Sequence, residues 1–339
     1  MEVYSYYIGI SCQVVILYNR GIIIESAIAK QQNFMMHTAI SQKTTKEICL
    51  SSLRKINFEY VEVIPPTLDT IEKISDMVFE ARKNNFWFSQ HAISKQQLSN
   101  FLFFLRVLDF RLWEHPRNWK EKPQDSSFWG LYKKIENISK FGFLKIDQKD
   151  FVSTLSPHES TPLAIARWNV FQKSRQWLLE NWEGDFKNFA DHYKSAVDFC
   201  LQLCSLEKFQ DITESGVHFL KPNQLLYLEY VLALGDPFTR RELCSLTAFA
   251  DYKLSQMLHM YGALRYSDKL EETLRKNPLL QVGSQEEVEI RAGALLAVEM
   301  LREQIGSDVC SYEVDVALWN GAHGIDISSP VHRVRSLYY

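Results

Sequence analysis

The segment GSQEEVEIRAGALLAVEMLREQIG (283–306) has the start, the spacing and the end of one long helix. Ser284 is a favourable N-cap, and Glu287 three residues later completes the capping-box pattern. Gly306 is a favourable stop at the C-terminal end. Glu287 and Arg291 lie four residues apart and share one face of this helix, so we predict an ion pair between them with a structural role.

Apolar residues recur at helical spacing from about Asn57 onward. In SLTAFADYKLSQMLHMYG (245–262) they form one stripe that Gly262 ends, which predicts a helix over this segment. In QQLSNFLFFLRVLDFRLW (96–113) they surround the segment almost completely, as in a central buried helix. We therefore predict a body built mostly of helices joined by short loops.

Strand patterns are sparse, because only EYVEVIPP (59–66) and HRVRSLYY (332–339) alternate between apolar and polar residues. The first fifty-odd residues have no clear helical period and end in the polar stretch SQKTTKE (41–47). We predict a mostly α fold, with a single globular helical domain at residues 57–339 and at most a few short strands. Residues 1–56 form an N-terminal appendage to which the sequence assigns no role.

The chain has 38 basic and 41 acidic residues, so its net charge is small. A near-neutral chain lacks the strong positive field of a protein that coats nucleic acid, although it is compatible with a local basic pocket. The apolar stretch at residues 8–17 is too short to cross a bilayer, and Glu2 stands where a signal peptide has basic residues. We therefore predict a cytoplasmic protein without membrane contact.

Motifs for several common chemistries are missing from the sequence. It contains no GxGxxG or GxxxxGK[ST] phosphate loop and no GxSxG elbow, which argues against the common nucleotide folds and the serine hydrolases. The six cysteines form no CxxC pair, and none lies with His at zinc-ligand spacing. Cys200 and Cys204, one helical turn apart, are more typical of buried packing than of metal binding. We predict reduced thiols and no metal site.

An acidic residue, Asp315, interrupts the otherwise apolar face of SYEVDVALWN (311–320). On a helix Asp315 shares one stripe with Tyr312, Val316 and Trp319. A carboxylate on such a buried stripe costs several kcal/mol in rough terms unless it is hydrogen-bonded, paired or protonated. Asp315 therefore has either a partner or a functional role.

Four segments together resemble the queuosine salvage family, the queuosine 5′-phosphate N-glycosylases/hydrolases. They are LTAFADYKLSQML (246–258), GSQEEVEIRA (283–292), the DxxLWN segment that begins at Asp315, and HRVRSLYY (332–339). Weaker agreement occurs in NFLFFLRVLDFRLW, SSFWGL, WEGDF and FLKPNQLL. The order and approximate spacing fit the family from about Asn57 to the last residue.

The resemblance implies a mostly helical fold similar to the helix-hairpin-helix DNA glycosylases. It also implies an enzyme that hydrolyses queuosine 5′-monophosphate to queuine and ribose 5-phosphate, for salvage into tRNA modification. Family members use no metal, and we expect no cofactor. The expected partners are the small-molecule substrate and the product queuine. We expect a monomer with no stable nucleic-acid partner.

The resemblance also carries individual residues over to this chain. Asp315 corresponds to the catalytic carboxylate, and Phe249 and Asp251 correspond to residues that hold the queuine base. His91 falls where the family has a substrate-binding histidine, four residues after a tryptophan. Lys221 matches a lysine expected to bind the phosphate.

Two neighbours of Asp315 depart from the family pattern. The family has an aromatic residue after the catalytic Asp and a second Asp at the end of the motif, whereas this chain has Val316 and Asn320. We count both positions as substrate-binding. The second Asp would contact the cationic side chain of queuine, and the aromatic residue would offer a stacking surface. Arg106 and Asp109, three residues apart, are predicted to form a buried pair that supports the site.

N-glycoside cleavage passes through a sugar with oxocarbenium character, which a nearby negative charge stabilises. Asp315 could act as a nucleophile, could activate the attacking water, or could stabilise the charge, and the sequence does not choose between these roles. Two other functions are a DNA-type base glycosylase and a non-catalytic helical scaffold in which Asp315 is merely paired. The balanced charge disfavours the first.

Overall fold

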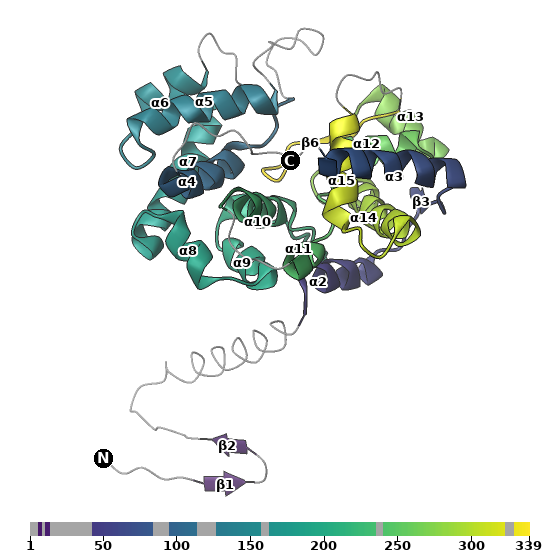
Figure 1. Ribbon diagram of the computed structural model, residues 1–339, viewed down its shortest axis with the longest axis horizontal. Helices are drawn as coiled ribbons and strands as arrows, with labels where there is room; N and C mark the ends of the chain where they lie inside the picture. The colour runs from purple at the N-terminus through teal and green to yellow at the C-terminus, as the bar shows by residue number, and fades with distance from the viewer. Residues whose placement is uncertain are drawn as a thin grey trace. The chain divides into compact units, whose positions relative to one another are not determined.

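The computed structural model describes residues 43–83, 95–113, 127–156, 163–234, 240–322 and 329–339, together with two short strands before them (Figure 1). The chain divides into two compact units, Met1–Lys43 and Thr44–Tyr339. In the first unit, β1 (Tyr6–Ile8) and β2 (Ser11–Gln13) pair antiparallel. The division at residue 57 stays a prediction, because it concerns which part of the chain carries the function.

Helices make up most of the second unit, so the predicted mostly α fold is confirmed. The helices of its first half are α2 (Thr45–Ser52), α3 (Leu68–Lys83), α4 (Lys95–Leu108), α5 (Phe128–Phe141), α6 (Gln148–Leu155), α7 (Ala164–Trp182), α8 (Phe186–His192) and α9 (Ala196–Leu203), with the 3₁₀ turns η1 (Leu53–Lys55) and η4 (Glu207–Phe209). Those of its second half are α10 (Lys221–Leu234), α11 (Arg240–Cys244), α12 (Tyr252–Met260), α13 (Asp268–Lys276), α14 (Gln285–Ile305) and α15 (Ser311–Gly321). The expected likeness to DNA glycosylases stays a prediction.

Two pairs of short strands decorate this helical unit. β3 (Val61–Val63) pairs antiparallel with β4 (Leu264–Tyr266), and β5 (Leu279–Leu280) pairs parallel with β6 (Arg333–Val334). β3 and β6 lie inside the two stretches whose alternation predicted strands, so both predictions are confirmed.

The long helix α14 begins and ends where its caps predict. The hydroxyl of Ser284 accepts the N–H of Glu287, and Gly306 is the C-cap. The predicted pair of Glu287 and Arg291 is present at 3.3 Å, with both side chains buried. The second half of the predicted capping box is wrong, because the Glu287 carboxylate accepts the N–H of Gly283 at 2.9 Å and not that of Ser284. The bounds of this helix are nevertheless predicted correctly from the sequence.

The helix predicted over residues 245–262 is wrong in its first part, because α12 begins only at Tyr252. The carboxylate of Asp251 is the N-cap and accepts the N–H groups of Lys253 and Leu254, each at 2.9 Å. The residues before it are not helical and use their own N–H groups elsewhere: Thr247 donates to Gln224, and Phe249 donates to Asp315. These side-chain acceptors replace the helical hydrogen bonds that the apolar stripe predicted.

The helix predicted over residues 96–113 also ends early, at Leu108. Buried cations take the carbonyl groups that a longer helix would use. The guanidinium of Arg167 donates to the carbonyls of Leu108 and Phe110, and the ammonium of Lys208 donates to the carbonyl of Asp109. Arg111 then adopts a left-handed backbone with φ 47°. The chain is thereby turned away from the helix axis.

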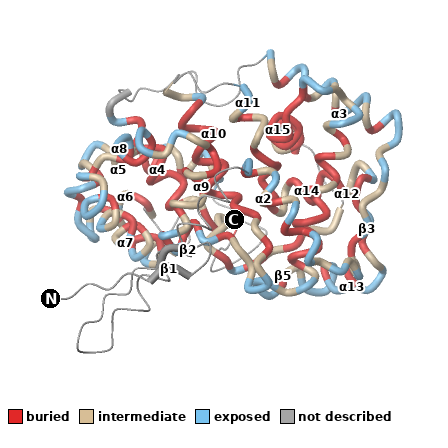
Figure 2. Tube along the Cα trace, turned by 90° about the horizontal axis from the view of Figure 1, so that it is seen from below, coloured by how far each residue is buried: buried red, intermediate tan, exposed pale blue. Residues whose placement is uncertain are grey.

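Within the second unit, α4–α8 gather on one side, α3 and α12–α15 gather on the other, and α10 lies between them (Figures 1 and 2). Each side has its own apolar core. The first is rich in phenylalanine and centres on α4, and the second centres on α12, α14 and α15. Residues 311–318 of α15 are all buried, as the red tube in Figure 2 shows. Asp315 therefore lies on a helix that is enclosed nearly all round.

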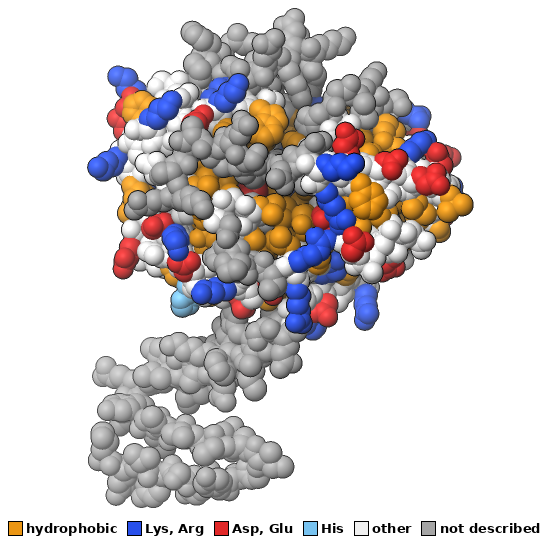
Figure 3. Space-filling model, viewed as in Figure 1, with side chains coloured by type: hydrophobic (Ala, Val, Ile, Leu, Met, Phe, Trp, Pro, Cys, Tyr) orange, Lys and Arg blue, Asp and Glu red, His pale blue; other side chains and the backbone are white. Residues whose placement is uncertain are grey.

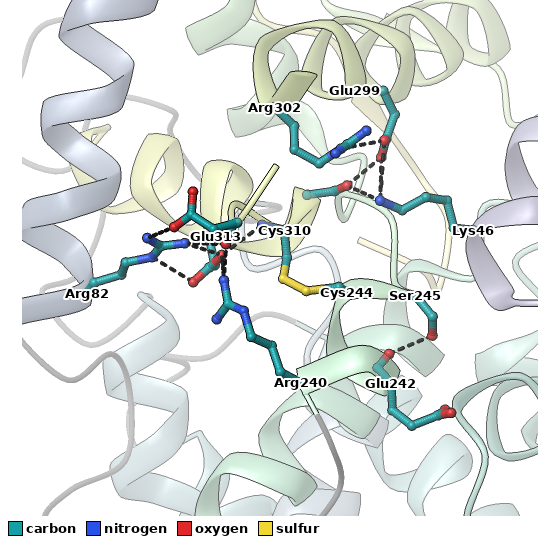
Figure 4. Close-up of a disulfide and its surroundings, with 12 residues drawn as sticks. Lys46, Arg82, Arg240, Glu242, Cys244, Ser245, Glu299, Arg302, Cys310 and Glu313 are labelled. Atoms are coloured by element: carbon teal, nitrogen blue, oxygen red, sulfur yellow. Dashed lines mark hydrogen bonds and ion pairs between the residues drawn. A yellow bond between two sulfur atoms is a disulfide. The ribbon is translucent and has the colours of Figure 1, made fainter. Parts of the chain in front are cut away.

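The structure contains a disulfide between Cys244, the last residue of α11, and Cys310, the N-cap of α15 (Figure 4). The prediction of reduced thiols is wrong for this pair. The two cysteines lie 66 positions apart in the sequence, and their Cα atoms lie 4.7 Å apart. No local pattern reports such a distant pairing. Beside the disulfide, Arg82 and Arg240 both bind the carboxylate of Glu313 on α15.

We expect reduction of the Cys244–Cys310 disulfide to lower the stability of the protein by about 2–4 kcal/mol, because the open chain gains the entropy of a long loop. The melting temperature should fall by several degrees in dithiothreitol. The double variant Cys244→Ala, Cys310→Ala should melt at the lower temperature with or without reductant. An identical melting temperature of the wild type in both buffers would contradict the expectation.

Candidate active site

A cavity of about 330 Å³ opens where the end of α4, the start of α10, the start of α12 and α15 come together. Five of the residues predicted from the sequence line it: Lys221, Phe249, Asp251, Asp315 and Val316. They come from three segments that are far apart in the sequence. The volume lies within the range of typical small-molecule sites. The structure therefore brings these five residues together around one space.

Two other predicted residues are not among those that line the cavity. Asn320 is exposed on the last turn of α15. His91 lies outside the described residues. Both assignments to substrate binding stay predictions.

Asp315 is a buried carboxyl with only 4% of its surface exposed. Its Oδ2 accepts the N–H of Phe249 at 2.6 Å, and none of the described Lys or Arg residues forms an ion pair with it. Burial raises its pKa well above the usual value, and the nearby charge of Asp251 raises it further. The Phe249 N–H and the charge of Lys221 oppose this rise. A strongly perturbed carboxyl that faces a cavity is typical of a functional group.

Phe249 and Asp251, the two neighbours of Ala250 in the chain, are each held in place by hydrogen bonds. The N–H of Phe249 binds Asp315, and the carboxylate of Asp251 caps α12. Both cap bonds use Oδ1 of Asp251, so among the described residues its Oδ2 has no hydrogen-bond donor. This oxygen is available to a ligand in the cavity.

Lys221 occupies the first position of α10, where its side chain is 7% exposed. Its backbone N–H donates to Asp211, and the preceding residue, Leu220, has a left-handed backbone with φ 51°. Within the described part of the chain, no acceptor or acid pairs with the Lys221 ammonium. Left-handed non-glycine residues are costly and often occur beside functional sites. A cation is thus held at the cavity by backbone geometry rather than by a salt bridge.

The predicted pair of Arg106 and Asp109 is confirmed at 2.6 Å, and the sequence missed its third member, Glu229. Arg106 Nε donates to Glu229 Oε2 at 2.6 Å, and both side chains are buried. Burial alone would raise the pKa of Asp109, but neighbouring cations, Arg106 above all, hold it below the usual value. Arg106 is therefore neutralised and supports the cavity wall.

Aromatic side chains make up much of the remaining lining: Phe110, Trp113, Phe128, Phe249, Tyr252, Trp319 and Tyr339. The rings of Phe128 and Trp319 meet edge to face at 6.3 Å, and the Arg106 guanidinium lies 4.8 Å from the centre of the Phe128 ring. Such walls suit a flat ligand that stacks. Trp113, Phe128 and Tyr339 were not predicted, because isolated aromatic residues are far more often part of a core.

In the described part of the chain no group of three or more His, Cys, Asp or Glu residues is arranged to hold a metal ion. No described helix combines the length and apolarity needed to cross a membrane.

A family profile described as queuosine salvage protein matches residues 89–339. The chain belongs to this family. The resemblance seen in the four sequence segments is therefore confirmed, and the matched region contains every predicted site residue.

Curated members of the queuosine salvage family give the same result. The protein from Sphaerobacter thermophilus is 30% identical over 267 residues, which cover 72% of this chain and 82% of the relative. The protein from Bos taurus is 26% identical over 277 residues, 71% of this chain and 81% of the relative. That from Mus musculus is 31% identical over 226 residues, 60% of this chain and 67% of the relative. All three are named queuosine 5′-phosphate N-glycosylase/hydrolase.

Proposed function

We propose that this member of the queuosine salvage family hydrolyses the N-glycosidic bond of queuosine 5′-monophosphate and releases queuine and ribose 5-phosphate. One observation carries the proposal. Asp315 is a buried carboxyl without a cationic partner in the described part of the chain, and its charge interacts with both Asp251 and Lys221. In a nucleotide the glycosidic bond lies between the base and the phosphate. An acid that shares one cavity with a base-binding carboxylate and an unpaired lysine suits such a substrate.

The reaction requires a negative charge at the sugar. As the bond to the base breaks, positive charge develops on the anomeric carbon and the ring oxygen. A carboxylate in a buried, pre-organised position stabilises this charge much more than the same group in water. Queuine is a 7-deazaguanine and lacks the N7 atom on which a departing purine is protonated. The sugar side, and therefore Asp315, must supply more of the stabilisation.

The phenyl ring of Phe249 offers a stacking face to the base, and Oδ2 of Asp251 accepts hydrogen bonds from the N–H groups of its guanine-like edge. Asp251 is pre-organised for this because its other oxygen caps α12. His91 is proposed as a further contact to the base. Val316 lines the cavity next to Asp315 and takes the place of an aromatic residue in the family pattern.

The two other functions find less support. A scaffold in which Asp315 is merely paired would provide a cation for it, and among the described residues it has none within ion-pair distance. A DNA glycosylase needs a surface that follows the phosphate backbone. On the face shown in Figure 3, acidic and basic side chains are mixed around hydrophobic ones, and the net charge of the chain is −3. We also propose that the protein is a cytoplasmic monomer without a stable nucleic-acid partner, and the balanced charge supports the last of these points.

Incubation of the protein with queuosine 5′-monophosphate should release free queuine and ribose 5-phosphate in equal amounts, both detectable by mass spectrometry. Guanosine 5′-monophosphate serves as the control substrate with the same sugar phosphate. The variant Asp69→Asn, an exposed acid on α3, should cleave the substrate like the wild type. The proposal fails if the wild-type protein leaves queuosine 5′-monophosphate intact.

A further inference from the structure

We propose that Arg291 is a positioning residue of the active site, whose single guanidinium fixes both the wall that holds the base and the start of the helix that holds the phosphate. This inference rests on the proposed function. It goes beyond the structural pair with Glu287 that the sequence predicts for this arginine.

Arg291 reaches the base-binding wall directly. Its Nε donates to the carbonyl of Ala250 at 3.1 Å. Ala250 lies between Phe249 and Asp251 in the chain. The N–H of Phe249, the residue before it, donates to Asp315 at 2.6 Å. This segment is thus held at one peptide by the guanidinium and at another by the catalytic carboxyl. Loss of either bond would let the segment shift relative to Asp315.

Arg291 reaches the phosphate end through Asp211. Nη1 donates to Asp211 Oδ1 at 2.8 Å, and Nη2 donates to Asp211 Oδ2 at 2.7 Å. The same Oδ2 accepts the backbone N–H of Lys221 at 2.9 Å. The carbonyl of Asp211 accepts the N–H groups of Phe219 and Leu220, so this aspartate fixes the whole turn that precedes α10.

The Arg291 guanidinium also contacts a third part of the cavity wall, formed by Tyr339. The Arg291 guanidinium lies 4.7 Å from the centre of the Tyr339 ring, which lines the cavity, and the Tyr339 hydroxyl donates to Glu287 Oε1 at 2.7 Å. Arg291 is only 2% exposed, and four of its five N–H donors are used in the bonds named here. A lysine offers no such planar fork and cannot reproduce these bonds together.

Arg291→Lys tests the proposal with measurements that report on folded molecules. We expect the affinity for queuine, measured by calorimetry, to fall about tenfold or more, because small displacements of binding groups are costly. The preference of kcat/KM for queuosine 5′-monophosphate over queuosine should fall as well. A merely structural role would lower the melting temperature and the binding stoichiometry while the affinity of the folded fraction stayed unchanged.

Asp211→Asn separates the two ends of the site and serves if Arg291→Lys does not fold. It disturbs the bonds to Arg291 and Lys221 but leaves the bond from Arg291 to Ala250 available. The phosphate preference should therefore fall while the queuine affinity changes much less. An unchanged phosphate preference in folded Asp211→Asn would overturn the phosphate half of the proposal.

One variant of α14 acts as a control. Arg302→Lys makes the same chemical change on the same helix, and Arg302 does not line the cavity. This variant should bind queuine like the wild type, even where stability falls. Wild-type queuine affinity and phosphate preference in folded Arg291→Lys would overturn the inference. Failure of the proposed function would instead be seen in the wild type, as absence of both binding and cleavage.

Discussion

Asp315→Asn should abolish hydrolysis of queuosine 5′-monophosphate and at the same time make the protein more stable at neutral pH. The amide keeps the shape of the side chain and an acceptor for the Phe249 N–H. It removes the charge that faces the developing cation, so we expect kcat to fall by about 10²–10³-fold or more. Mass-spectrometric detection of queuine measures the loss, and binding of queuine should persist.

The gain in stability follows from the raised pKa of Asp315. Between the usual carboxyl pKa and the raised one, the folded protein binds a proton that the unfolded chain has released. Stability contributed by this group therefore falls as pH rises through that interval. The asparagine variant carries no such group, so its melting temperature should exceed that of the wild type at neutral pH. The difference should shrink as the pH is lowered towards the usual pKa of an aspartate.

The same carboxyl predicts the acid limb of the activity profile. Because the ionised form of Asp315 is needed, kcat/KM should decline as pH falls through the raised pKa, well above the usual range of an aspartate. Near wild-type turnover by Asp315→Asn would show that this residue is not the catalyst. A melting temperature at or below that of the wild type at neutral pH would contradict the stability argument.

The sequence predicts those features that depend on neighbours along the chain. The caps of α14 and the alternation in β3 and β6 are local patterns, and each element forms where its pattern predicts. Asp315 can be recognised in the sequence because a carboxylate in an apolar stripe is costly unless it has a partner or a functional role. The structure places it at a cavity. Its raised pKa is consistent with the low polarity of that same stripe.

The remaining features depend on contacts between distant residues. The early end of α4 follows from Arg167 and Lys208, which lie far along the chain and bind the carbonyl groups of Leu108 and Asp109. The late start of α12 follows from acceptors on α10 and α15 that have no counterpart in the local sequence. Arg291 shows the same limit, because helical spacing identifies Glu287 as its neighbour but gives no hint of Asp211, 80 residues away.

The preference for a nucleotide over a nucleoside should depend on Lys221. Lys221 lines the cavity and is largely buried, and no acid or acceptor among the described residues binds its ammonium. A 5′-phosphate would supply the missing partner. One charge-assisted hydrogen bond is worth on the order of 1.5–3 kcal/mol, about tenfold to a hundredfold in an equilibrium. Lys221→Ala should therefore lower kcat/KM for queuosine 5′-monophosphate by about that factor and leave cleavage of queuosine nearly unchanged.

The kcat/KM values of the wild type and of Lys221→Ala have to be compared on the alkaline plateau of the pH profile. The charge of Lys221 lowers the pKa of Asp315, so its removal raises that pKa and shifts the acid limb for both substrates to higher pH.

Lys253→Ala is the matched control, because Lys253 is a second lysine at the cavity, on the α12 side. If Lys253→Ala loses the phosphate preference and Lys221→Ala keeps it, the phosphate binds at the start of α12. If both lysine variants keep the preference, neither lysine binds the phosphate. Loss of preference in Lys221→Ala alone identifies the start of α10 as the phosphate site, where the Lys221 ammonium has no partner among the described residues.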